Sequence, residues 1–390
     1  MSIKKNEEPS DSVAADEIEA AVDYRRQQQC SSALFAIDPQ QLANSAQYAI
    51  ERIDDFAGKF PQVVIESVRS NLQADVEGLS HAQDKLTHLV VSSLAREVEA
   101  ACERVGLDLR SGVAAGAYHG DGVGAMRQSV PGTRAGIVLI SANLLLLCNE
   151  VSKLVIRSGE SLGDFEPLKI AISASASEVA QVRDKELLDD WIDFFARRAV
   201  DPLLSPPGRE YVLAPELHAL QSNLLQAMEL FVVAHEYAHH IEDHGRLNEL
   251  GANGPNMDVM RNDELHADAI AIMICQELSR SAERSNLFLS SSAGALAIIL
   301  VLELLRWATN IVDTGSAIGS ARDTHPELDV RIQNIVESTK RLQGDVGESK
   351  FLRLGVLQTI QHFWRAARTS LDDMHDDGVR SVRKTEQWLP

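Results

Sequence analysis

The sequence predicts an α+β fold that is predominantly α-helical, with a small sheet and additional helices at both ends of the chain. Most of its apolar stretches repeat at helical spacing, as in Leu86, Leu89, Val90, Leu94 and Val98. Only a few short runs have the composition of β-strands. With 390 residues, 45% of them hydrophobic, the chain is long enough to bury a substantial core.

Composition excludes some functions and favours one compartment. The net charge of −20 and the pI near 5.0 argue against a nucleic-acid partner, because phosphate binding needs clustered Lys and Arg. The four cysteines are scattered without a CxxC pair, and the first residues lack the apolar segment of a secretory signal. We therefore expect a cytoplasmic protein with free thiols, and the sequence leaves its oligomeric state open.

The first part of the chain divides into two predicted regions. Residues 1–32 are acidic and poor in large apolar side chains, so we expect a disordered tail. Residues 33–134 carry helical periodicity and are interpreted as an N-terminal helical module. The glycine-rich stretch over 106–136 predicts a long loop.

The predicted core covers residues 135–345 and begins with a strand, 136–141, followed by a helix with Ser141 as N-cap. Two further β-rich runs, 168–175 and 210–215, predict a small sheet before a long helix that starts near Glu216. Helices follow to the end of the core, and residues 346–390 predict a C-terminal helix and tail.

One segment has the composition of a membrane span. Residues 285–302 contain no charged side chain and just reach the length of a transmembrane candidate. Three consecutive serines and a glycine interrupt this segment, and Glu303 and Arg306 follow at helical spacing. We interpret it as a buried core helix, which makes a membrane partner the less favoured alternative.

The segment FVVAHEYAHHIEDHG, residues 231–245, carries the chemistry. His235 and His239 are four residues apart, so on a helix both side chains lie on one face, where they can bind one metal ion. Glu236 lies beside that face, where a base for a metal-activated water belongs. The alternative is a polar helix face with accidental spacing. Tyr237, His240 and His244 are placed at the surface or behind the ligands.

A third ligand is predicted downstream, since a catalytic zinc ion typically takes three protein ligands. In RNDELHADAIAIMICQEL, a helix capped by Asn262 or Asp263 would place Glu264 and Asp268 on one face. Glu264 can then reach the metal, and Asp268 can accept a hydrogen bond from the second N–H of a ligating imidazole. The alternative is a capped helix with solvated acids. The metzincin motif, another metallopeptidase pattern that begins with HExxH, is excluded. It requires Gly at position 242 and His or Asp at position 245, where this chain has Glu242 and Gly245.

These motifs resemble those of a known family. HEYAH followed by ELHAD is similar to the gluzincin zinc metallopeptidases, and THPELDVRI at 324–332 with GIVLISANLLLLCNE at 136–150 resembles the M48 branch. The ImmA/IrrE-like metallopeptidases are the second choice. The chain departs from the M48 pattern by the inserted segment 155–215 and by its N-terminal residues. The resemblance implies a gluzincin-like catalytic core within residues 135–345.

The expected function is that of a zinc-dependent endopeptidase for a selective protein substrate. His235, His239 and Glu264 would bind Zn²⁺, and Glu236 would act as the general base. The resemblance further implies that His325 or Arg331 stabilises the oxyanion, with Pro326 at the first position of a helix; a helix cap and a structural ion pair are the alternative. Two other classes stay open, a non-catalytic zinc-binding scaffold and a metal-free helical interaction protein.

A mode of substrate binding also follows from the predicted sheet. The strand 136–141 is expected to lie at the edge of the sheet, where an extended peptide can add as a further strand. Backbone hydrogen bonds would then hold the substrate, and its side chains would be selected by neighbouring pockets.

Overall fold

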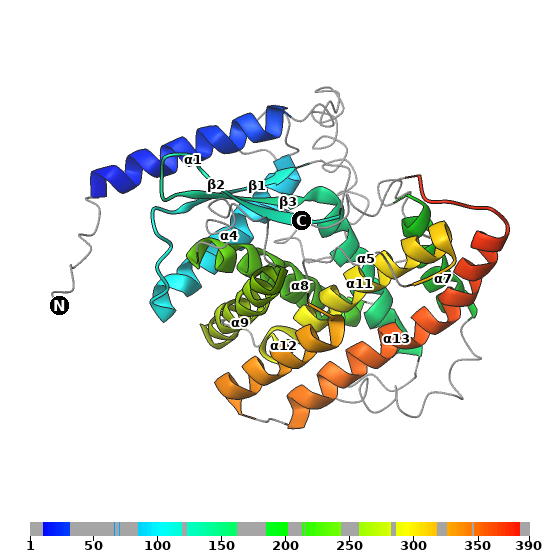
Figure 1. Ribbon diagram of the computed structural model, residues 1–390. Helices are drawn as coiled ribbons and strands as arrows, with labels where there is room; N and C mark the ends of the chain where they lie inside the picture. Colours follow the sequence, from blue (N-terminus) through cyan, green and yellow to red (C-terminus); the bar gives the residue numbers. More distant parts are fainter. Residues whose placement is uncertain are drawn as a thin grey trace.

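The fold is predominantly helical with a three-stranded sheet, as expected (Figure 1). The computed structural model describes the following residues: 11–31, 66, 70, 85–118, 123–161, 185–201, 213, 215–242, 257–281, 286–317, 326–344 and 347–382. The predicted strand 168–175 lies outside these ranges, and so do residues 210–212 and 214 of the predicted strand 210–215.

The three strands are β1 (Val113–Tyr118), β2 (Ala125–Ser129) and β3 (Gly136–Ser141), in the order β1-β3-β2. β3 pairs with β1 in parallel and with β2 antiparallel. Two expectations were therefore wrong. The glycine-rich stretch contains two strands rather than one long loop, and β3 is the central strand rather than an edge.

The small side chains of β1 explain why a glycine-rich segment forms a strand here. Val113 and Ala117 pack into the main core, whereas Ala114 and Tyr118 pack into a smaller cluster on the other face of the sheet. Small residues let helices approach both faces closely, so burial outweighs the low strand propensity of Ala and Gly.

Residues 11–31 form a helix, α1 (Asp11–Ser31), and are not the expected disordered tail. Few apolar side chains hold it, which is why composition suggested disorder. Ala21 is fully buried against the sheet, while the side chains of Arg25 and Gln29 donate hydrogen bonds to backbone carbonyls of β1. In Figure 1, α1 lies along the outside of the sheet.

The remaining helices build the core beside the opposite face of the sheet. Their order is α4 (Lys85–Val105), α5 (Ala142–Ser161), α7 (Lys185–Val200), α8 (Pro215–Ile241), α9 (Met257–Ser281), α10 (Leu287–Ser290), α11 (Ala293–Thr314), α12 (Leu328–Gln343) and α13 (Gly347–Asp376). The predicted strand-to-helix unit is confirmed, with the backbone N–H of Asn143 donating to the Ser141 side chain 3.2 Å away. The long helix near Glu216 and the C-terminal helix are also confirmed.

α8 is the central helix, since it contacts β2, β3, α4, α5, α9 and α11. Gly294 of α11 faces Ala227 of α8 so closely that an added Cβ would lie 2.5 Å from the Ala227 Cβ. The backbones of α8 and α11 therefore pack in close contact, and a larger side chain at 294 would separate them.

The apolar segment does not form one helix over 285–302. It breaks at Ser291 and Ser292, with Ser292 in the left-handed region at φ 61°, and separates the short α10 from the long α11. α11 is long and apolar enough to cross a membrane, yet most of it is buried within the protein. It occupies the position of a core helix, as the serines and the following charges indicated.

A partly buried carboxyl group on α8 makes stability depend on pH. Burial raises the pKa of Glu229 from its ordinary value of 4.5 to about 8. Between these two pH values the folded protein keeps a proton on this carboxyl group that the unfolded chain has already lost. The free energy of unfolding should therefore fall as pH rises from about 4.5 to about 8. We expect Glu229→Gln to remove this fall and to stabilise the protein at pH 8.5 by on the order of 1 to 3 kcal/mol.

Denaturant unfolding of both proteins at pH 5.5, 7 and 8.5 measures this effect, and Glu103→Gln, which changes an exposed glutamate of α4, is the control. Equal pH profiles for the parent and Glu229→Gln would show that Glu229 is solvated.

Candidate metal centre

Two adjacent helices supply the predicted ligands. His235 and His239 lie on one face of α8, and Glu264 and Asp268 lie on the facing side of α9. The predicted cap was wrong, because α9 begins at Met257 and continues through residues 262 and 263. The spacing argument holds all the same, since residues four apart share a face anywhere within a helix.

The three predicted ligands converge to within metal-binding distance. Nε2 of His235 lies 3.1 Å from Nε2 of His239, and the two carboxylate oxygens of Glu264 lie 3.4 Å and 3.3 Å from these nitrogens. Bonds of about 2.1 Å in a tetrahedral site place ligand atoms about 3.4 Å apart. Among the residues that the structure describes, these three form the one group of His, Cys, Asp or Glu donors close enough to share an ion.

The electrostatics of this group favour a cation. Burial by itself lowers the pKa of His235, but the carboxylates of Asp268 and Glu264 outweigh it and raise that pKa to about 10. The imidazole nitrogens and the carboxylate thus lie in a partly buried environment where a positive charge on or between the imidazoles is favoured. A divalent cation satisfies all three donor atoms at once.

Asp268 supports His235 from behind and is itself supported by Arg331. Nδ1 of His235 lies 3.0 Å from Oδ1 of Asp268, which leaves Nε2 to face Glu264. Nε and Nη2 of Arg331, on α12, donate to the two oxygens of Asp268 at 2.9 and 2.7 Å. Burial would raise the pKa of Asp268, but Arg331 and His235 lower it below its ordinary value. The fully buried Asp268 is therefore ionised and fixes the orientation of the imidazole ring.

We expect Asp268→Asn to weaken metal affinity by roughly 10 to 100-fold, because the neutral amide no longer stabilises His235 as a ligand. Asparagine keeps the volume and an acceptor for Arg331, whereas alanine would leave the guanidinium of Arg331 without a hydrogen-bond acceptor at this position. Competition with a chromogenic chelator measures the affinity, and circular dichroism confirms the fold. Unchanged affinity would show that Asp268 acts only on Arg331.

Of the two residues predicted to stabilise the oxyanion, the structure describes Arg331 but not His325. Pro326 precedes Glu327, the N-cap of α12, so the expected first helical position for Pro326 was wrong. Arg331 forms the ion pair with Asp268 and also lines a pocket beside the ligands, where its Nη2 lies 3.8 Å from Glu264.

Glu236 lies next to the three candidate ligands. It is 6% exposed and lines the same pocket as His235 without joining the three ligand atoms. Burial raises the pKa of its carboxyl, while His239 and His235 lower it in part. Tyr118 and Arg127 lie close enough for their charges to interact with that of Glu236, and sequence reasoning missed both because β1 and β2 were not predicted.

The other residues of the motif have structural functions. Tyr237 is fully buried and donates to Oε1 of Glu99 at 2.7 Å, and His240 is fully buried with Nε2 donating to the carbonyl of Leu109 at 2.9 Å. Of the two placements expected for them, at the surface or behind the ligands, the surface is therefore excluded for both. An added Cβ at Gly136 would lie 2.5 Å from Nδ1 of His240, so this glycine lets β3 approach α8. His244 lies outside the described residues.

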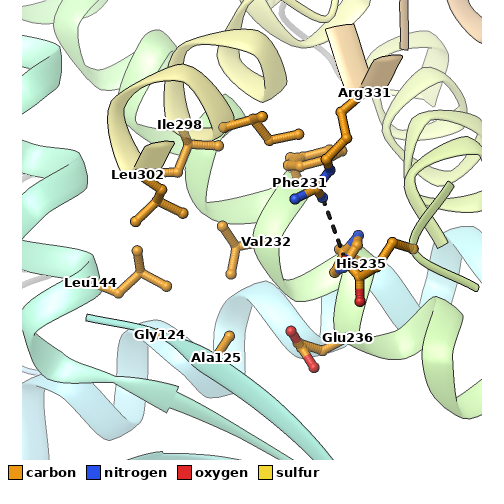
Figure 2. A pocket seen from close by; sticks show the side chains of 12 residues that line it. Gly124, Ala125, Leu144, Phe231, Val232, His235, Glu236, Ile298, Leu302 and Arg331 are labelled. Carbon is orange, nitrogen blue, oxygen red and sulfur yellow. Dashed lines mark ion pairs between the residues drawn. The ribbon is translucent and has the colours of Figure 1, made fainter. Parts of the chain in front are cut away.

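A pocket opens beside the ligands, and sequence reasoning had not identified it (Figure 2). Its volume is about 70 Å³. Besides Gly124, Ala125 and the charged residues of the site, its lining is apolar: Leu144, Phe231, Val232, Ile298, Ile299 and Leu302. The sequence could have indicated only one part of this pocket. Residues 231, 232, 235 and 236 lie within one and a half turns of α8, so helix periodicity alone places them close together.

Comparison with known proteins gives no relative: no family model matches the chain, and searches of curated proteins and of solved structures return no match.

Proposed function

We propose that the protein is a zinc-dependent endopeptidase with a gluzincin-type site. The observation that carries this proposal is the convergence of two imidazole nitrogens and one carboxylate, at 3.1 to 3.4 Å from one another, beside a buried glutamate and a pocket. Nitrogen and carboxylate donors suit zinc, and three protein ligands leave one coordination position open, as in catalytic zinc sites.

Each residue of the site is given a function in this proposal. His235, His239 and Glu264 hold the ion, which when bound supplies Lewis acidity toward a carbonyl group and a water molecule. Glu236 takes a proton from the water and passes it to the leaving amine, a task for which a carboxyl of raised pKa is suited. Arg331 holds Asp268 in place and, at the pocket wall, also offers a hydrogen-bond donor to the substrate carbonyl.

The substrate is a peptide or protein chain. Gly124 and Ala125, at the start of β2, line the pocket together with Glu236. Among the described strands, β2 pairs with β3 alone, so its other side is available to an extended peptide. β2 thus takes the substrate-binding position that the sequence had suggested for β3.

The M48-like branch is the proposed relationship, with the ImmA/IrrE-like metallopeptidases as the alternative. Both use HExxH with a downstream acidic helix, and the distances above support either. We also propose a cytoplasmic location, in keeping with the buried, unpaired Cys102, Cys148 and Cys275.

Metal removal tests the proposed function. A chelator should strip about one zinc ion per chain and abolish cleavage of a substrate found by proteome-wide peptide profiling, and zinc should restore both. Metal analysis and cleavage are measured on the same sample. Zinc binding without cleavage of any profiled peptide would favour the non-catalytic scaffold, and absence of bound metal would favour the interaction protein.

A further inference from the structure

We propose that the pocket beside the metal ligands selects a branched aliphatic side chain of the substrate, next to the bond that is cleaved, and excludes aromatic and charged side chains. This inference rests on the proposed function and adds the class of substrate to it. The arguments come from the lining, the volume and the rigidity of the pocket.

The lining separates into an apolar and a charged end. In Figure 2 the side chains of Leu144, Val232, Ile298 and Leu302 gather on one side, and those of His235 and Arg331 lie on the other. Leu144, Phe231, Ile298 and Ile299 are all buried. A substrate side chain that enters the apolar end would lose most of its contact with water, so a charged group there would lose hydration without gaining a partner at that end.

The volume sets an upper limit on the side chain. The cavity measures about 70 Å³, and an apolar cavity of about 150 Å³ is known to hold a benzene molecule. A space half that size fits the four carbons of a leucine side chain better than the seven carbons of a phenylalanine side chain. Burying such a group should strengthen binding about 10 to 100-fold over glycine, at about 1.5 to 3 kcal/mol per buried aliphatic side chain.

The wall of the pocket that α11 supplies is held rigidly against α8. Ile298, Ile299 and Leu302 come from α11, and one turn earlier Gly294 of the same helix is in tight contact with Ala227 of α8. α8 carries the opposite wall, Phe231 and Val232, so these two walls keep a fixed separation. Leu302 is half-buried and therefore less tightly packed than Ile298.

The geometry thus identifies Leu302 as the residue that limits the size of the side chain. Leu302→Ala removes three carbons from the wall without leaving a sealed internal cavity, so the fold should tolerate it better than a change at Ile298. Leu146→Ala is the matched control, because Leu146 lies on α5 with 54% of its surface exposed.

The experiment compares four peptide hydroxamates that differ only in the side chain next to the metal-binding group: hydrogen, isobutyl, benzyl and carboxymethyl. Calorimetry on the zinc-loaded full chain should show the isobutyl compound binding at least 10-fold tighter than each of the others. Leu302→Ala should strengthen benzyl binding about 10-fold, and Leu146→Ala should change none of the four. Benzyl or carboxymethyl binding as tightly as isobutyl to the parent would overturn the inference.

A second measurement separates failure of this inference from failure of the proposed function. The metal-free protein, with ¹³C-labelled Ile and Leu methyl groups, is titrated with N-acetyl-leucinamide and with N-acetyl-phenylalaninamide. The methyl signals of Ile298 and Leu302 should shift with the leucine amide alone, whether or not zinc binds. Shifts with both amides, or with neither, would overturn the inference, whereas absence of zinc from the parent refutes only the metallopeptidase.

Discussion

The Glu236→Gln variant should lose peptide cleavage by roughly 10² to 10⁴-fold, the usual contribution of a general base, while it retains zinc and folds normally. Glutamine has the size and shape of glutamate but cannot accept the proton. Glu236 lies next to the ligands without being one of them, so its replacement leaves the three metal-binding atoms in place. The amide of glutamine also carries no charge, so its burial should not destabilise the fold.

Three measurements on the same preparation check this result: zinc content, thermal stability and the rate of cleavage of a substrate on which the parent is active. Glu242→Gln is the matched control, since Glu242 is exposed just beyond the end of α8. Cleavage by Glu236→Gln at the parent rate would refute the hydrolase even with zinc bound.

The second large effect concerns the metal itself. We expect His235→Ala combined with His239→Ala to reduce bound zinc from about one ion per chain to a trace, because two of the three protein ligands are removed. The remaining carboxylate of Glu264 would bind zinc no better than an ordinary surface carboxylate does.

Elemental analysis after gel filtration measures the stoichiometry, and circular dichroism reports whether the helices persist. The control is His266→Ala, which removes an exposed histidine two residues from Glu264 on α9. Stoichiometric zinc in the double variant would place the metal elsewhere and contradict the proposed site.

The ligand set could be predicted because its geometry is local. His235 with His239, and Glu264 with Asp268, are each four residues apart, and helix periodicity alone places each pair on one face. That the two faces meet was expected because a catalytic zinc ion takes a third protein ligand, and the family resemblance implied the same. The start of α9 could not be placed, because Asn262 and Asp263 favour caps but also occur within helices when neighbouring turns are well packed.

Contacts between distant segments explain what the sequence did not reveal. Arg331 lies 63 residues from Asp268, so their ion pair has no local signal. The pocket combines side chains from β2, α5, α8, α9, α11 and α12. Residues 11–31 lack the apolar content that predicts order, and their helix is held by a few specific contacts to β1. Sequence patterns report periodicity and composition, and neither reports which elements pack together.

The hydrogen bonds from α1 to β1 have a consequence for solubility. A strand at the border of a sheet presents unpaired backbone oxygens, which can pair with another chain and start aggregation. The carbonyls of Ala115 and Ala117 accept instead from the side chains of Arg25 and Gln29. Within the part of the chain that the structure describes, β3 is the one strand paired with β1. A helix with little apolar surface of its own thus covers the backbone groups that would otherwise recruit a second molecule.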